Sequence, residues 1–162
     1  MTNKMDLLVY ESESMKINYP KDWQKFDMGK GAVLFLYPGK EMTYFLAEKF
    51  IIMSPSVEEF SKIPSMAGKP LNLENIANAT IEGAIKKGAV VNKSDVTELK
   101  IDGVPAKSII LITPVGDTKL KIMQIVAVKD QKAHMVSYSA SEENFGKYYK
   151  LAEEVFNSIK IK

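Results

Sequence analysis

His134 is the only histidine in the chain, and histidine is the side chain whose unperturbed pKa lies nearest neutral pH. It is in phase with Val136 and Tyr138 in a stretch that alternates like a β-strand. A general base or metal ligand is one interpretation, and a histidine packed in a sheet or at its edge is the other, which we favour. The sequence contains no Gly-x-Ser-x-Gly motif that would support a Ser-His-acid triad.

Carboxylates are the other groups that could do chemistry, and six of the 20 acidic residues form three adjacent pairs. Neighbouring residues on a helix do not share a face, and acids in a first turn are favourable to the helix dipole. We therefore expect solvated surface acids, no catalytic residue, no metal ligand and no cofactor. With no cysteine, a metal site would need carboxylates and at most one histidine. The pairs are Glu58-Glu59, Glu142-Glu143 and Glu153-Glu154.

The cationic side chains argue against nucleic acid as a partner. The net charge is only +2, and all 22 basic residues are lysine, so the bidentate fork of arginine is missing. A compositional bias of the genome would also explain the missing arginine. Gly29-Lys-Gly31 and Gly116-Asp117 have neither the phosphate-loop spacing nor the dinucleotide fingerprint. A lysine cluster is interpreted as a guard against strand pairing at a sheet edge rather than a docking patch. It comprises Lys119, Lys121, Lys129 and Lys132.

The segment from Lys119 to Lys129 is predicted to be the central strand, because both of its faces are apolar. Asp130-Gln131 is short enough for a two-residue turn, and Lys132 to Ala140 returns as the next strand. Such a strand needs cover on both sides of its sheet. One face carries Leu120, Ile122, Val126 and Val128, and the other carries Met123, Ile125 and Ala127.

Two helices can supply that cover. A helix is predicted over Leu73–Lys87, with Asn72 as N-cap and Gly88 as the left-handed stop. Its apolar stripe is Leu73, Ile76, Ala77, Thr80, Ile81, Ala84 and Ile85. The C-terminal helix has the stripe Phe145, Tyr148, Ala152, Val155, Phe156 and Ile159. A short helix through Lys62 follows the cap residue Ser56.

Further strands are predicted around these helices, and Asp102-Gly103 indicates a type I′ hairpin turn. The 162 residues, 46% hydrophobic and 26% charged, suit one domain over residues 1–162. The predicted class is α+β: an α/β/α sandwich with one central antiparallel sheet and helices on both faces. The further strands span residues 5–10, 15–19, 32–37, a part of 43–53, 89–101 and 104–113.

The cellular compartment stays open at this point. The chain has no cysteine, so no disulfides are expected. The first residues contain no apolar segment long enough for a signal peptide or a membrane span. We expect either a cytoplasmic protein or a sequence trimmed to its mature part.

Three segments together resemble the PsbP-like family. They are Val9–Trp23, which closes on Tyr-Pro-Lys-Asp-Trp, the hairpin Leu99–Ala106, and the helix entry Tyr138–Phe145, which leads into the helix that ends at Ser158-Ile-Lys-Ile161. The resemblance covers nearly the whole chain and agrees in order and spacing. It departs at Ile159, where the family usually has Phe.

The resemblance implies an α/β/α sandwich that is shared with a nuclear import factor binding the GTPase Ran. Plant members are extrinsic subunits of photosystem II, and prokaryotic members are often exported, commonly as lipoproteins. The matched residues Pro20, Trp23, Gly103 and Phe145 have structural roles in that pattern. No basic docking segment of the photosystem members is matched, so a photosynthetic role is not expected.

These observations lead to one main expectation and two alternatives. The main one is a non-catalytic accessory or protein-interaction domain, monomeric, with an unidentified protein partner and no nucleic acid. It would be the soluble, extracytoplasmic part of an exported or lipid-anchored protein. The first alternative is a small-molecule or metal-ion binding protein, or an unrecognised hydrolase, with a pocket beside Trp23 and His134. The second is a cytoplasmic GTPase-binding factor.

Overall fold

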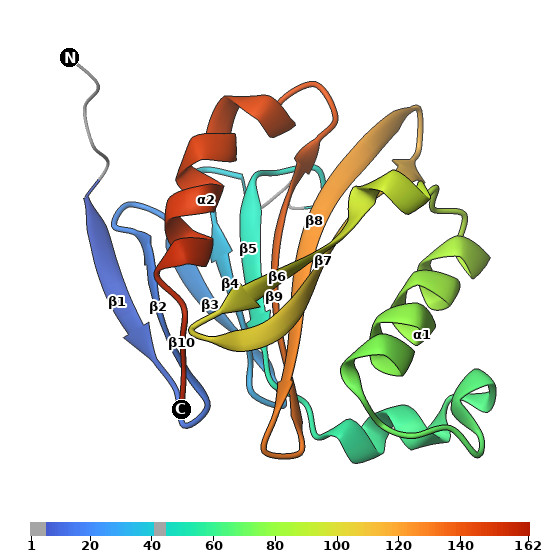
Figure 1. Ribbon diagram of the computed structural model, residues 1–162. Coiled ribbons are helices and arrows are strands. Elements are labelled where there is room, and N and C mark those ends of the chain that lie inside the picture. The colour runs from blue at the N-terminus through green and yellow to red at the C-terminus, as the bar shows by residue number, and fades with distance from the viewer. Residues whose placement is uncertain (1–5, 41–44) are drawn as a thin grey trace.

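The computed structural model describes residues 6–40 and 45–162 and contains two antiparallel sheets (Figure 1). The larger has seven strands in the order β3-β4-β5-β9-β8-β7-β6, and the smaller has the order β1-β2-β10. The strands are β1 Leu7–Glu11, β2 Met15–Pro20, β3 Gln24–Gly29, β4 Ala32–Leu36, β5 Lys49–Met53, β6 Val96–Ile101, β7 Val104–Val115, β8 Thr118–Lys129, β9 Lys132–Ser141 and β10 Lys160–Ile161.

β8 occupies the interior position that its two apolar faces predict. It lies between β7 and β9 and pairs with both along its length. Met123, Ile125 and Ala127 enter the core on one side of the sheet, and Val126 enters the core on the other. Asp130 and Gln131 form the predicted two-residue turn, both with positive φ (52° and 65°). Asp102 and Gly103 likewise form a two-residue turn with positive φ (52° and 78°).

One face of the large sheet is covered by α2 (Tyr149–Asn157) together with the small sheet. A 3-10 segment over Phe145–Tyr148 leads into α2. Met15 and Ile17 of β2 share this core with the helix. Both are fully buried because the small sheet packs against the large one at these residues. The apolar stripe predicted for the C-terminal helix is confirmed, because Phe145, Ala152, Val155 and Phe156 lie in this core and Tyr148 packs against it. Ile159 is also in the core, but it lies just beyond the end of α2.

The other face is covered by α1 (Leu73–Lys86) and by two 3-10 segments, Val57–Lys62 and Pro64–Met66. The predicted caps are confirmed. Asn72 Oδ1 accepts a hydrogen bond from Asn75 N–H (2.9 Å), and Gly88 stops the helix with φ 99°. The predicted stripe needs one correction, because Ile85 is half exposed while Ala79 is buried instead. The sandwich with a central antiparallel sheet is therefore confirmed.

Three elements differ from expectation. β3 was not predicted, because the alternation in its exposed sequence Gln-Lys-Phe-Asp-Met-Gly spans only Lys25 to Met28. The strand expected from residue 89 begins only at Val96, after a 3-10 turn at Lys93–Asp95. A single sheet was expected, but β10 joins β2 and completes a second one. The predicted strands that begin at Met5 and at Thr43 have their first residues outside the described part of the chain.

Candidate functional site

The outer edge of β3 is an exposed surface of the large sheet. All six residues of the strand are solvent-exposed, and within the described residues β3 pairs only with β4. Phe26 and Met28 are 39% and 50% exposed, although both are large apolar side chains. An edge strand offers unpaired backbone N–H and C=O groups to another extended chain. β3 thus combines free backbone groups with apolar side chains.

The turn after β3 shapes the end of this edge. Gly29, Lys30 and Gly31 all have positive φ, and the register with β4 shifts between Asp27 and Gly29. Asp27 Oδ1 accepts a hydrogen bond from the Gly29 N–H at 2.8 Å. Glycine adopts this left-handed backbone at little cost, and it occupies two of the three turn positions.

An apolar hollow of about 390 Å³ opens beside this edge. Phe26 lies opposite Leu34, which lies opposite Ile51, so the three side chains share one face of the sheet. Met53 is two residues beyond Ile51 and therefore points to the same face. The hollow is lined chiefly by Met53, Phe60, Ile63 and Met135. Phe26 and the hollow therefore face the same way.

A second, polar cavity of about 290 Å³ lies beside the small sheet and shares Lys30 and Met53 with the apolar hollow. Lys132 Nζ donates to Ser14 Oγ (2.9 Å) across it. Ser54 Oγ is 3.0 Å from Nδ1 of His134, which lies behind the cavity wall. The lining consists of Tyr10, Ser12, Glu13, Ser14, Met15, Lys30, Gly31, Ile52, Met53, Ser54 and Lys132.

His134 is a packed histidine, as expected, since it is only 3% exposed. Burial lowers its pKa, and a contact with the backbone of Lys129 offsets this only in part, so the ring is neutral at pH 7. Nδ1 contacts Ser54, whereas Nε2 has no hydrogen-bond partner within the described part of the chain. A serine hydrolase needs a third group that orients the histidine and stabilises its cation. Among residues 6–40 and 45–162 no such group pairs with His134, so the described residues give this serine and histidine no third member of a triad.

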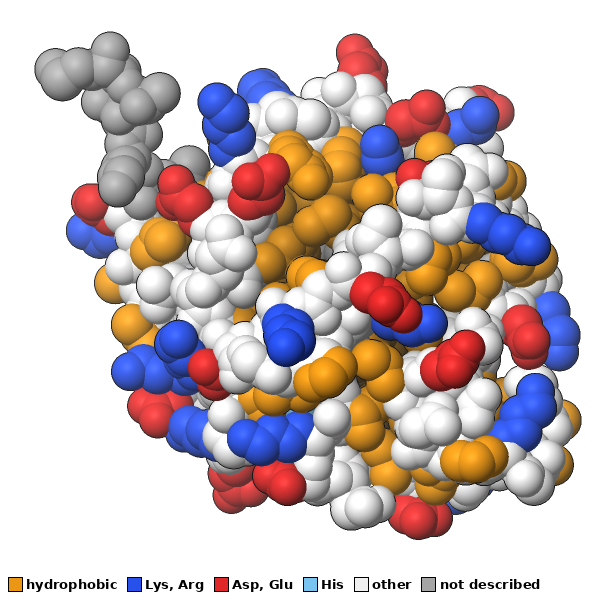
Figure 2. Space-filling model, viewed as in Figure 1, with side chains coloured by type: hydrophobic (Ala, Val, Ile, Leu, Met, Phe, Trp, Pro, Cys, Tyr) orange, Lys and Arg blue, Asp and Glu red, His pale blue; other side chains and the backbone are white. Residues whose placement is uncertain are grey.

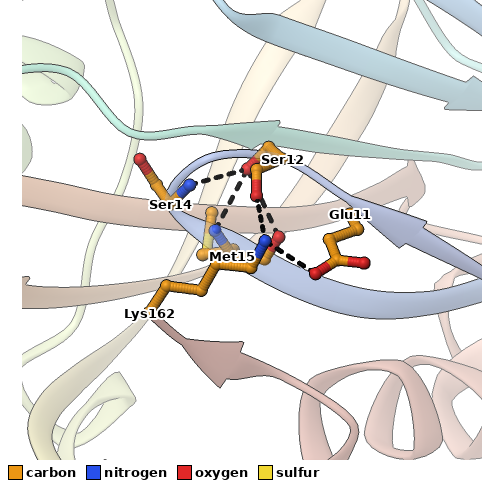
Figure 3. A network of polar contacts seen from close by, with 5 residues as sticks. All are labelled: Glu11, Ser12, Ser14, Met15 and Lys162. Carbon is orange, nitrogen blue, oxygen red and sulfur yellow. Dashed lines mark hydrogen bonds and ion pairs between the residues drawn. The ribbon is translucent and has the colours of Figure 1, made fainter.

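The β1–β2 turn that walls the polar cavity is held from the far end of the chain. Figure 3 shows Lys162 reaching over this turn. Its Nζ lies 2.7 Å from Glu11 Oε1 and donates to the Ser12 carbonyl oxygen at 2.6 Å. The hydrogen bond from Lys162 lowers the pKa of Glu11. Ser12 Oγ accepts from the Ser14 and Met15 N–H groups (3.2 and 3.0 Å), which tightens the turn.

Trp23 does not lie near His134. It is buried in an aromatic cluster, with ring centroids 5.7 Å from Tyr37, 5.3 Å from Phe50 and 6.0 Å from Tyr148. Phe50 pairs with Tyr138, which is four residues, roughly 13 Å, along β9 from His134. The structure therefore separates the two residues that the small-molecule hypothesis placed beside one pocket.

The structure confirms some predictions for the charged residues and contradicts others. The three glutamate pairs are exposed, as predicted. The interpretation of the lysine cluster as an edge guard is wrong, because β8 and β9 are interior strands. Lys121 instead lies over the Phe145 ring, 4.7 Å from its centroid. In residues 6–40 and 45–162, no three His, Asp or Glu side chains gather in a way that could hold a metal ion.

The surface charge has no single sign. Figure 2 shows lysine and acidic side chains intermixed over the face that carries α1 and α2, with hydrophobic side chains between them. A nucleic-acid footprint requires clustered positive charge. Within the described part of the chain, no helix is long and apolar enough to cross a membrane.

No protein-family model and no curated protein matches the sequence, whereas solved structures match the fold. Cyanobacterial PsbP from Synechocystis sp. PCC 6803 superposes with a TM-score of 0.65 at 14% identity, covering 99% of this chain and 95% of that one. The Saccharomyces cerevisiae Ran-binding protein Mog1p superposes with a TM-score of 0.61 at 10% identity, covering 98% and 96%. This chain has the PsbP-like fold.

A third solved structure with the same fold is longer. The Bacteroides thetaiotaomicron protein superposes with a TM-score of 0.55 at 18% identity, covering 91% of this chain. This chain spans only 45% of the length of that protein. These structural similarities show the PsbP-like fold and no other part of the expected resemblance. A fold hosts many functions, so the function must be argued from the surfaces described above.

Two features of these surfaces were missed by sequence reasoning. No strand was predicted over Gln24–Gly29, although Phe26 and Met28 alternate with Lys25 and Asp27. That short alternation is the signal that could have found it. The pairing of Ser54 with His134 joins residues 80 positions apart, and no local pattern reports such a contact.

Proposed function

We propose that this chain is a non-catalytic protein-interaction domain of PsbP-like fold, spanning residues 1–162 and acting as a monomer. The observation that carries the proposal is the β3 edge, where every residue is exposed and Phe26 and Met28 present apolar surface. An extended segment of a partner can add to such an edge through backbone hydrogen bonds. The hollow lined by Met53, Phe60 and Ile63 would take one of its apolar side chains.

The chemistry of the described residues favours binding over catalysis. His134 is buried and neutral, and no acid orients it, so Ser54 has no activated base. A protein partner suits the chain better than nucleic acid, because the net charge is +2 and arginine is absent.

Site-specific photocrosslinking in the source cells tests this proposal. A benzophenone amino acid at Met28 should give one discrete adduct, and the same group at Ile85 of α1, equally exposed, should not. Adding Phe26→Asp should abolish the Met28 adduct without changing the fold, while Val90→Asp at another exposed position should leave it. Adducts that form equally at both positions, or that survive Phe26→Asp, would reject β3 as the interaction edge.

The proposed monomeric state is tested by a separate measurement. Light scattering over a wide range of protein concentration should give a constant mass equal to one chain. A mass that doubles as the concentration rises would instead mean that β3 pairs with a second copy of this chain.

We further propose that the full-length protein is exported or lipid-anchored and that this domain lies outside the cytoplasm. The support is the sequence resemblance to a family whose prokaryotic members are often exported. Fractionation of cells that express the full-length gene, with metabolic labelling by a radioactive fatty acid, tests both parts. Recovery in the cytoplasmic fraction without label would contradict this localisation and leave the protein-binding proposal intact.

A small GTPase is the partner that the yeast neighbour suggests, since that neighbour is described as a Ran-binding protein. A cytoplasmic location and binding to a GDP- or GTP-loaded GTPase would favour this alternative. The binding assay should include the Phe26→Asp variant, because a GTPase bound elsewhere would be insensitive to β3.

A further inference from the structure

The polar cavity lies where turns from three parts of the chain meet. The β1–β2 turn supplies Ser12 to Ser14, the β3–β4 turn supplies Lys30, and Lys132 follows the β8–β9 turn. Figure 1 shows the β1–β2 and β8–β9 turns at the same end of the molecule, the lower end in that view. The volume of about 290 Å³ is at the small end of ligand-binding pockets.

The charges around the cavity leave an excess of one positive charge. Lys30 and Lys132 carry two ammonium groups, and Glu13 is the single acid in the lining. Lys132 is half-buried, and its Nζ is fixed by the hydrogen bond to Ser14 Oγ. An ammonium group held in a partly buried position attracts an anion more strongly than one that moves freely in water. The charge balance therefore suits one monovalent anion.

Two hydroxyl groups can donate to that anion. Ser14 Oγ accepts from Lys132, which leaves its own proton for another acceptor. Ser54 Oγ also lines the cavity and lies 3.0 Å from His134 Nδ1. The Ser54 hydroxyl donates to the anion when Nδ1 carries the ring proton.

The rest of the lining is apolar. Met15 and Ile52 form one wall, Tyr10 adds an aromatic ring, and Met53 lines the boundary with the β3 hollow. From these features we infer that the cavity binds a small organic carboxylate. Lys30, Lys132, Ser14 and Ser54 contact the carboxylate oxygens, and the apolar wall contacts the carbon skeleton. This cavity shares Lys30 and Met53 with the β3 hollow, whereas Ser14, Ser54 and Lys132 line this cavity and not the hollow.

NMR titration of the isotope-labelled chain tests the inference, with benzoate, acetate and inorganic phosphate as probes and sodium chloride as the ionic-strength control. Benzoate should shift the amides of residues 12–15, 30–31, 53–54 and 132 with a Kd of about 1 mM or tighter. Acetate should bind more weakly because it leaves the apolar wall uncovered. Inorganic phosphate should also bind more weakly, since it carries more charge than the cavity balances.

Three substitutions locate the site. Lys30→Gly removes an ammonium group at a turn position whose φ of 53° glycine adopts easily, so this variant keeps the fold. Lys30→Gly and Lys132→Met should each weaken benzoate binding at least about tenfold. Ser54→Ala should weaken it several-fold, and Lys86→Met, at the exposed end of α1, should not change it. Unshifted amides, equal affinity in Lys30→Gly, or tighter binding of phosphate than of benzoate would each overturn the assignment.

Discussion

The Tyr138 hydroxyl donates a hydrogen bond to the Phe145 carbonyl oxygen at 2.8 Å, and both residues are buried. Their rings also pack together, with centroids 4.9 Å apart. This contact closes the chain between the end of β9 and the 3-10 segment that begins the helical cover. The helix entry recognised in the sequence is therefore held by a specific polar bond inside an apolar core.

Replacing Tyr138 with Phe should destabilise the protein by about 1–3 kcal/mol, because the Phe145 carbonyl would be left buried without a donor. Urea unfolding followed by circular dichroism measures this loss. Tyr149→Phe is the matched control, since Tyr149 is 37% exposed, and its free energy of unfolding should change by less than about 0.5 kcal/mol. Equal effects of the two substitutions would show that the hydroxyl of Tyr138 contributes nothing specific.

Trp23 should be a major contributor to stability. It is 4% exposed and packs against Tyr37, Phe50 and Tyr148, so Trp23→Ala should cost about 3–5 kcal/mol. Circular dichroism is the appropriate probe, because the substitution removes the only tryptophan and its fluorescence. Phe26→Ala on the exposed edge should change stability by less than about 0.5 kcal/mol. A loss at Phe26 that matched the loss at Trp23 would contradict the picture of β3 as an open edge.

Asp102 combines a turn position with a long-range hydrogen bond. Its Oδ2 accepts from the Ile161 N–H at 3.0 Å, its Oδ1 lies 3.7 Å from Lys160 Nζ, and its φ is 52°. Asp102→Asn keeps an oxygen acceptor and tolerates this φ, and the exposed ion pair adds little, so it should cost less than about 0.5 kcal/mol. Asp102→Ala loses both and should cost about 1–3 kcal/mol in urea unfolding. A large loss in the Asn variant would mean that charge dominates.

Stability should fall in mild acid because of His134. Burial lowers its pKa in the folded state, so below about pH 6.5 the unfolded chain binds a proton that the folded chain does not. The stability is fully present above that pH and is lost as the pH falls toward the folded-state pKa, by up to about 1.4 kcal/mol per pH unit. His134→Gln should lack this slope between neutral pH and pH 5.5. Parallel curves for the two proteins would show that His134 does not titrate differently on folding.

The sequence predicted those parts of the fold that depend on local periodicity. β8 has two apolar faces, α1 has a capped amphipathic pattern, and both hairpin turns have residues that accept positive φ. These signals arise within a few residues, so they can be recognised without knowing which distant segments pack against them. The position of β8 in the middle of the sheet followed from the need to cover both of its faces.

The elements that were missed depend on distant partners. β10 is two residues long, and it is a strand only because β2 lies beside it. β3 is exposed on both sides, and its hydrophobic pattern is limited to Phe26 and Met28. The lysines of β8 were assigned to an edge because sequence order does not tell which strands are interior. The polar cavity joins three turns that are far apart in sequence, which only the folded chain brings together.

The small sheet also sets an order of events during synthesis. β2 pairs on one side with β1 and on the other with β10, although roughly 140 residues separate β10 from β2 in the chain. While the ribosome is still making α2, one edge of β2 has no strand to pair with, and Met15 and Ile17 lack part of their cover. The first strands to be translated must therefore wait for the segment around Lys160–Ile161 before their sheet is complete. A nascent chain stalled before that segment should expose this surface to chaperones.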